Sequence, residues 1–199
     1  MSADAPSREA VLAAIRRAAL APTEAPEPWV SSAASDRAPS ERFAEALEVA
    51  GGKARLMAPA DLPSALAEYA DALGATTIHS THPGLASRSP GAAPDSPHDL
   101  AALDLAVAAG APAVAESGAV WLTPADALAR AALFLAEHVA LVVSEAEIVP
   151  DLHQAYARID PGATPFGCFV AGPSKTADIE QVLVIGAHGA RTLTVFLTR

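Results

Sequence analysis

The segment FVAGPSKTADIEQVLVIGAHGA (residues 169–190) combines residue types that could bind an anion. It opens as an apolar strand, turns at Gly-Pro, and continues with Ser174 or Thr176 as the N-cap of a helical turn. Backbone N–H groups and Lys175 would then converge just past the carboxyl end of a strand, a place that attracts anions. The alternative is an ordinary capped turn with a solvated lysine. The segment has no Walker spacing, and the chain contains no G-x-G-x-x-G.

A second candidate for chemistry is Glu116, in AVAESGAVWL (residues 113–122). Small apolar residues precede it and Ser117-Gly118 follow it, so we expect a buried carboxylate at a tight turn before a strand. A buried carboxylate needs a partner, which Lys175 or Arg130 could supply, and Glu116 would then be half of a structural ion pair. No G-x-S-x-G surrounds the serine, which argues against a hydrolase nucleophile.

The histidines and the single cysteine do not predict a metal site. His79 and His82 lie near a strand end without a second cluster of ligands, and Cys168 alone cannot hold zinc or an iron–sulfur cluster. We therefore expect no metal and no cofactor in this chain. His188 is flanked by glycines on a tight turn before the last strand, where it could face a ligand or fix the turn by a hydrogen bond.

The elements that must position these residues alternate along the chain. Short apolar runs bounded by turn residues predict strands at 54–58, 76–79, 105–108, 120–123, 139–143, 169–171 and 193–197. Helical patterns occupy 7–20, 40–50, 62–73, 128–135 and 148–159. This alternation predicts an α/β fold, with a mixed or mostly parallel sheet and helices on both faces. The long loop at 80–99 should cover a site or be mobile.

The domain organisation follows from proline content and helix caps. Residues 1–40 are predicted as an N-terminal helix, capped by Ser7, with a proline-rich arm, and residues 41–199 as a single α/β domain. Ser40 should cap the next helix, and Gly51-Gly52 should end it. The amphipathic arm should pack on the domain or cross to a neighbouring copy, so an oligomer is possible through it.

Charge and composition exclude several classes of protein. The net charge of −10 over 199 residues, with scattered basic residues, argues against binding nucleic acid or an anionic membrane. No apolar run reaches the length of a membrane span, and the first residues lack the layout of a signal peptide. The expected location is the cytoplasm.

Three segments together resemble a known family: ESGAVWL (116–122), HVALVVSEAEIV (138–149) and AGPSKTADIEQVLVIGAHGARTLTVFL (171–197). They are similar to the LUD-domain family, of the lactate-utilisation protein C type, whose members carry E-[ST]-G, G-P-S-[RK]-T-A-D-I-E and G-x-H-G. The resemblance covers roughly residues 104–199. Ser117, Ala119 and Ala190 depart from the family, which often has threonine, threonine and proline at these positions.

The resemblance implies a NagB/RpiA/CoA-transferase-like fold, which is the fold of sugar-phosphate isomerases and CoA transferases. It also implies a role in oxidising L-lactate to pyruvate beside iron–sulfur partner proteins, with this chain as the component that lacks clusters and binds a small carboxylate, a phosphate or a partner. The candidate ligand-binding residues are Glu116, Ser117, Gly118, Gly172, Ser174, Lys175, Thr176, Asp178, Glu180 and His188.

An enzymatic alternative stays open at this point. In the related CoA transferases a glutamate in a similar context attacks the thioester, which makes Glu116 the candidate catalytic residue. The chain would then be a stand-alone isomerase, CoA transferase or cyclo-ligase, with Lys175 holding the phosphate or carboxylate of its substrate.

Overall fold

The computed structural model describes residues 5–19, 24, 36–91, 93–176 and 184–199. The chain divides into two units, residues 1–30 and 31–199. The first contains helix α1 (Ala5–Ala18), which starts before Ser7, so Ser7 is not its N-cap as predicted. Two apolar side chains of this helix, Val11 and Ile15, are 58% and 61% exposed.

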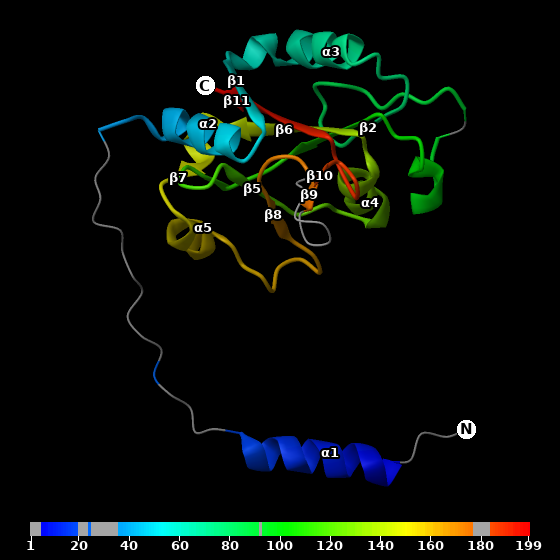
Figure 1. Cartoon of the computed structure of the whole chain (residues 1–199), viewed down its shortest axis with the longest axis vertical. Coiled ribbons are helices and arrows are strands. Elements are labelled where there is room, and N and C mark those ends of the chain that lie inside the picture. The colour runs from blue at the N-terminus through cyan, green and yellow to red at the C-terminus, as the bar shows by residue number, and fades with distance from the viewer. Residues whose placement is uncertain (1–4, 20–23, 25–35, 92, 177–183) are drawn as a thin grey trace. The chain divides into compact units, whose positions relative to one another are not determined.

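The second unit is built on a five-stranded sheet in the order β1-β11-β6-β3-β2 (Figure 1). Its strands are β1 (Lys53–Met57), β2 (Ile78–Ser80), β3 (Leu105–Ala109), β6 (His138–Ser144) and β11 (Thr192–Thr198). Every neighbouring pair is parallel. The central strand β6 is almost entirely buried, as expected for a parallel strand covered on both faces. The predicted α/β fold with a mostly parallel sheet is confirmed.

A smaller sheet, in the order β7-β4-β5-β8, packs against one face of the five-stranded sheet. Its strands are β4 (Ala113–Val114), β5 (Ala119–Leu122), β7 (Ile148–Val149) and β8 (Cys168–Val170). The pairs β4–β5 and β5–β8 are antiparallel. The predicted helix at 148–159 was wrong at its start, because Ile148 and Val149 form β7 and Asp151 caps α5 (Leu152–Arg158).

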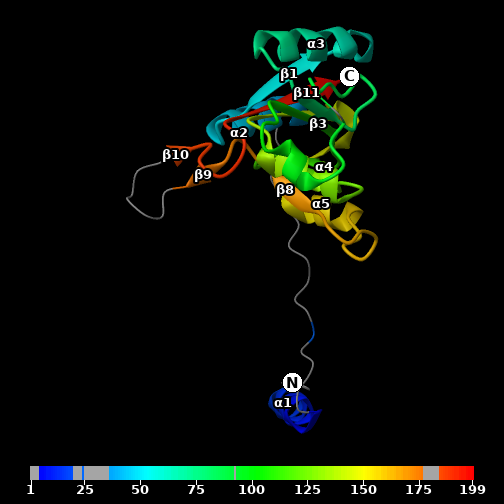
Figure 2. The ribbon, with the colours of Figure 1, turned by 90° about the vertical axis from the view of Figure 1, so that its right-hand side faces the viewer.

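Helices cover both faces of the parallel sheet (Figure 2). They are α2 (Pro39–Val49), α3 (Leu62–Ala72) and α4 (Ala127–Leu135), with short 3-10 turns at Pro59–Asp61, Pro97–Leu100 and Glu145–Glu147. Helix α3 packs Leu66 and Tyr69 against one face. Helices α2 and α4 and the small sheet lie on the other face, around Phe43 and Leu141.

The ends of α2 agree with the sequence prediction at one terminus only. Ser40 is buried inside the first turn and Ala38 is the N-cap residue, without a side-chain hydrogen bond, so Ser40 is not the predicted cap. At the other end Gly51 has φ +85° and its N–H donates to the Glu48 carbonyl. The predicted glycine stop is confirmed.

The loop after β2 folds back along that strand. Arg88 forms an antiparallel bridge with Ile78, through N···O distances of 2.6 and 2.9 Å. The Ser87 hydroxyl accepts the Ser80 N–H at 2.9 Å. The loop therefore covers the outer side of β2. Within the described residues, no helix has both the length and the apolar character to cross a membrane.

Candidate functional site

Glu116 lies at the tip of a tight turn between β4 and β5. The N–H groups of Ser117 and Gly118 both donate to the Val114 carbonyl. Glu116 is exposed, which contradicts the predicted burial. Its Oε1 accepts the Leu152 N–H at 2.8 Å, at the start of α5, and in the described part of the chain it forms no ion pair with Lys175 or Arg130. The carboxylate therefore stabilises a helix start.

The motif glycines are contact points with α2. Gly118 has φ +66°, and a Cβ on it would lie 2.5 Å from the Leu47 Cα. Gly172 has φ +71°, and a Cβ there would collide with the Ala50 carbonyl. Two segments of the family motif, about fifty residues apart in the sequence, thus converge on the C-terminal half of α2.

Lys175 is exposed and lies in a two-residue strand, β9 (Lys175–Thr176), which pairs with β10 (Val184–Ile185). A helix that starts directly after Ser174 is excluded, because Lys175 and Thr176 are extended. The helical turn expected after Thr176 falls on residues 177–180, which lie outside the described residues. The Lys175 Cε and Nζ atoms would lie 3.3 Å from a Cβ on Gly51. The ammonium group therefore lies at the C-terminal, negative end of α2, where a cation is favourable. Asp178 and Glu180 lie outside the described residues.

His188 lies in a turn that Ser174 holds by backbone hydrogen bonds. The Ser174 N–H donates to the Ala190 carbonyl at 2.8 Å, and the Gly186 N–H donates to the Ser174 carbonyl at 2.9 Å. Backbone groups therefore hold this turn, and the exposed His188 ring borders an open groove of about 650 Å³ together with Glu137 and Arg191.

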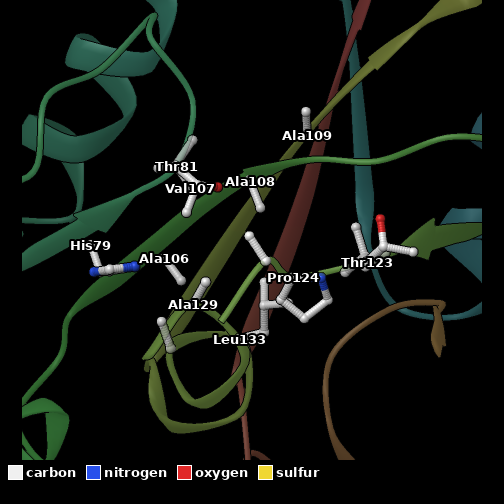
Figure 3. Close-up of a pocket in the computed structure, with 13 residues that line it drawn as sticks. His79, Thr81, Ala106, Val107, Ala108, Ala109, Thr123, Pro124, Ala129 and Leu133 are labelled. Carbon is white, nitrogen blue, oxygen red and sulfur yellow. The ribbon is translucent and has the colours of Figure 1, made fainter. Parts of the chain in front are cut away.

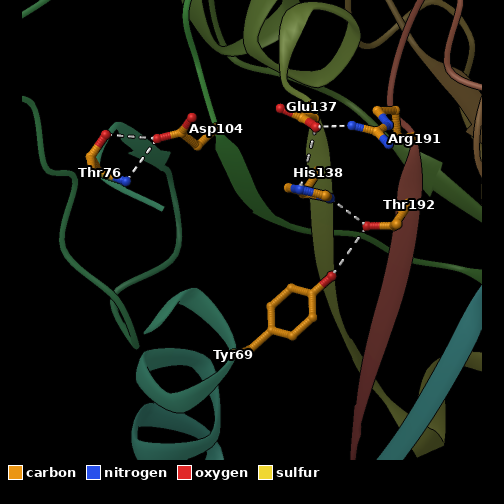
Figure 4. A network of polar contacts seen from close by, with 7 residues as sticks. All are labelled: Tyr69, Thr76, Asp104, Glu137, His138, Arg191 and Thr192. Carbon is orange, nitrogen blue, oxygen red and sulfur yellow. Dashed lines mark hydrogen bonds and ion pairs between the residues drawn. The ribbon is translucent and has the colours of Figure 1, made fainter. Parts of the chain in front are cut away.

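Two groups of polar contacts, which the sequence analysis missed, lie at the amino ends of parallel strands (Figure 4). Asp104 accepts the N–H groups of Thr76 and Thr77 at 2.7 and 2.8 Å, and the Thr76 hydroxyl at 2.9 Å. The hydrogen bond from the Thr77 N–H holds the pKa of Asp104 below its ordinary value, and the hydrogen bonds from the Thr76 N–H and hydroxyl add smaller effects in the same direction. His138 Nδ1 is 2.8 Å from the Thr192 hydroxyl. The signal in the sequence was a polar residue at or just before the start of each strand.

A small cavity of about 150 Å³ lies between the carboxyl half of β3 and α4 (Figure 3). Alanines leave this space, because Ala106 and Ala108 of β3 face Ala129 and Ala132 of α4 across it. Its further lining residues are His79, Thr81, Val107, Ala109, Leu122, Thr123, Pro124, Ala125 and Leu133. Sequence reasoning missed the cavity, since it depends on how a helix and a strand meet.

His79 is the histidine that faces this cavity. Its Nε2 atom is buried and has no hydrogen-bond partner in the described structure. His82, by contrast, accepts the Gly84 N–H at 3.0 Å through Nδ1, and burial lowers its pKa. In the described residues no three His, Cys, Asp or Glu side chains are grouped to hold a metal ion. Cys168 is a half-buried free thiol, whose pKa is raised by burial.

Comparison with known proteins places the chain in a family. The family model of the LUD domain matches residues 98–198, about half of the chain. A crystal structure of a DUF162 family protein from Deinococcus radiodurans has a TM-score of 0.59 at 21% identity, covering 81% of this chain and 96% of that chain. This likeness supports the fold. The chain belongs to the LUD domain family.

Curated relatives carry one name. Lactate utilization protein C of Geobacillus kaustophilus is 34% identical over 120 residues, which is 57% of this chain and 47% of that protein. The proteins of the same name from Geobacillus thermodenitrificans and Bacillus subtilis are 39% and 37% identical over 82 residues, 38% of this chain and 34% of each relative. The match therefore spans between a third and a half of their length.

Proposed function

We propose that the chain is the component without iron–sulfur clusters of an L-lactate-utilising system in the cytoplasm. In that system it docks a cluster-bearing partner. The name shared by its relatives supports the choice of system. The expectation that this chain binds no metal or cofactor is part of the same proposal, since cluster chemistry needs several cysteines and this chain has one.

The observation that carries the docking role is the exposed position of the motif side chains. We define the motif surface as Val49, Gly51, Glu116, Ser117 and Lys175, all exposed at or beside the end of α2. Val49 is 82% exposed and borders a shallow groove with Glu116 and Ser117. An apolar residue among charged ones, outside a closed cavity, is typical of a protein contact.

The enzymatic alternative has weaker support. A nucleophilic glutamate needs an environment that activates it, and Glu116 is an exposed residue whose carboxylate binds the backbone of α5. The position of the Lys175 side chain at the C-terminal end of α2 favours a role other than binding an anion. Lys175 is therefore proposed as a contact to an acidic patch of the partner.

The test is copurification from the native host grown on L-lactate. Tagged full-length protein should retain cysteine-rich iron–sulfur proteins, measured by mass spectrometry and iron content. Lys175→Glu should lower the retained amount about tenfold, because a like charge at an interface costs on the order of 1.4 kcal/mol or more. Arg199→Glu is the control, since Arg199 is an exposed cation just past the carboxyl end of β11, beside Glu145 and outside the motif surface. Absence of any enriched cysteine-rich protein would refute the proposal.

A further inference from the structure

We propose that the cavity beside His79 binds a short-chain monocarboxylic acid with a hydroxyl or keto oxygen on its second carbon. The cavity is distinct from the motif surface, and none of its lining residues belongs to that surface. It lies toward the carboxyl ends of parallel strands, which is where open α/β sheets bind small ligands.

The size of the cavity limits the ligand. A protein cavity of about 150 Å³ holds benzene, a molecule of six non-hydrogen atoms. A three-carbon hydroxy acid or keto acid also has about six non-hydrogen atoms, so it fits the 150 Å³ found here. The alanine side chains of β3 and α4 provide an apolar wall for its methyl group. An acid with an aromatic or long aliphatic tail would collide with this wall.

The Nε2 atom of His79, unpaired among the described residues, requires a polar group on the ligand. Its register partner on β3 is Ala106, so the two side chains project on the same face of the sheet, toward α4. A buried nitrogen without a partner is costly, and it becomes satisfied when a ligand oxygen reaches it. With the carboxylate at the open end of the cavity, the ring nitrogen can donate to a keto oxygen or accept from a hydroxyl group on the second carbon. This atom therefore selects an acid that carries an oxygen within the cavity.

The open end of the cavity suits a carboxylate. Thr81 and Thr123 line the cavity and are exposed, so their hydroxyl groups can bind an anion that stays in contact with water. In the view of Figure 3, His79 and Thr123 stand at opposite ends of the group of side chains. The Thr81 hydroxyl donates to the Val107 carbonyl at 3.4 Å, a long hydrogen bond that a ligand can replace.

The same lining excludes phosphorylated compounds. Among the described lining residues there is neither lysine nor arginine, the cations that most often offset the desolvation of a phosphate dianion. The choice of L-lactate and pyruvate as probes rests on the proposed function, whereas the site itself rests on the cavity and on His79.

The experiment titrates the purified full-length chain with L-lactate, pyruvate, propionate and 3-phosphoglycerate, up to millimolar concentrations, by ligand-observed NMR. Lactate or pyruvate should bind. Propionate lacks the oxygen that meets His79 and should bind about tenfold more weakly, the ratio expected for one lost hydrogen bond. Phosphoglycerate should not bind.

Two variants separate a ligand site from a structural histidine. His79→Leu should weaken lactate or pyruvate binding at least tenfold and raise the melting temperature of the free protein, because it removes an unsatisfied buried nitrogen. Ala129→Leu should fill the cavity and block binding, whereas Ala127→Leu, at an exposed position of the same helix, should leave binding unchanged.

The proposal is overturned if neither acid binds the wild-type chain, or if His79→Leu binds as well as wild type. It is overturned also if His79→Leu lowers the melting temperature and keeps full binding. Copurification with iron–sulfur proteins tests the docking role independently. A chain that copurifies but binds no acid would refute this site alone, and a chain that binds acid without copurifying would refute the docking role alone.

Discussion

Gly118 lies where a turn contacts the backbone of α2. Two properties favour glycine there: the positive φ angle, and the lack of room for a Cβ atom. Its φ of +66° favours glycine, and the Leu47 backbone leaves no room for a Cβ. Gly74 has almost the same φ, +65°, but a Cβ there would meet nothing within 4 Å. The chain thus contains a matched control for the steric contact alone.

We expect Gly74→Ala to lower the free energy of unfolding by about 1–2 kcal/mol, the cost of a left-handed backbone. Gly118→Ala should lower it by about 1–3 kcal/mol more, because the added methyl group overlaps α2. Urea unfolding monitored by circular dichroism measures both. Equal losses for the two variants would mean that the turn and α2 are not in close contact.

For single residues, the sequence predicted which segments lie together more accurately than the exposure and the contacts of each side chain. The motif segments converge on α2, but Glu116 was expected to be buried because its neighbours are small and apolar. The strand ends at Val114, and the turn that follows directs Glu116 outward, to the start of α5. Residue types near a site do not determine which side of a tight turn a side chain takes. His79 was missed for a similar reason, since its orphan nitrogen exists only in the packed structure.

Secondary-structure elements followed the sequence where their apolar runs were long. A strand overlaps each of the seven predicted ones, although β2 begins two residues later than expected, at Ile78. The two-residue strands β4, β7, β9 and β10 are too short for any periodicity to reveal. Ile148 and Val149 share spacing with α5 and were assigned to it, although Pro150 separates the two elements.

Asp104 ties β2 to the start of β3, which makes it a test of stability at the element scale. Hydrogen bonds from Thr77 and Thr76 depress its pKa in the folded chain, so its contribution is fully present above the unfolded pKa of about 4. The contribution is lost as the pH falls through the lower, folded pKa. Asp104 is partly exposed, so solvent screening limits its contribution.

Asp104→Asn should therefore lower the free energy of unfolding by about 1 kcal/mol at neutral pH. The difference from wild type should shrink as the pH drops below about 4 and vanish below the folded pKa. Thermal unfolding across this pH range measures the difference, with Asp71→Asn as control, since Asp71 is exposed and its ion pair with Arg88 is long, at 3.9 Å. A loss that persists unchanged in acid would assign the effect to packing.

The whole chain consists of two units, an N-terminal unit that contains helix α1 and an α/β domain with a hydrophobic core. Among the described residues, the members of all three hydrophobic clusters lie from Phe43 onward, within the second unit. Helix α1 carries an apolar stripe in which Val11 and Ile15 are more than half exposed. Such a stripe is costly in water and is typical of a helix that associates.

Removing residues 1–35 should leave the urea midpoint of the domain unchanged, because Arg37 keeps its contacts with Glu41 and Glu45 and the core is untouched. The full chain should sediment as a larger assembly than the truncated one, by more than the mass of the arm, because association between copies buries the apolar stripe. Val11→Asp combined with Ile15→Asp should reproduce the truncated state, while Arg8→Asp, on the polar side of the helix, should not. Sedimentation velocity at several concentrations measures the assembly size of each variant.

A monomeric full chain with an unchanged urea midpoint would mean that the arm has no role in self-association. A lower urea midpoint after truncation would show that the arm stabilises the domain directly.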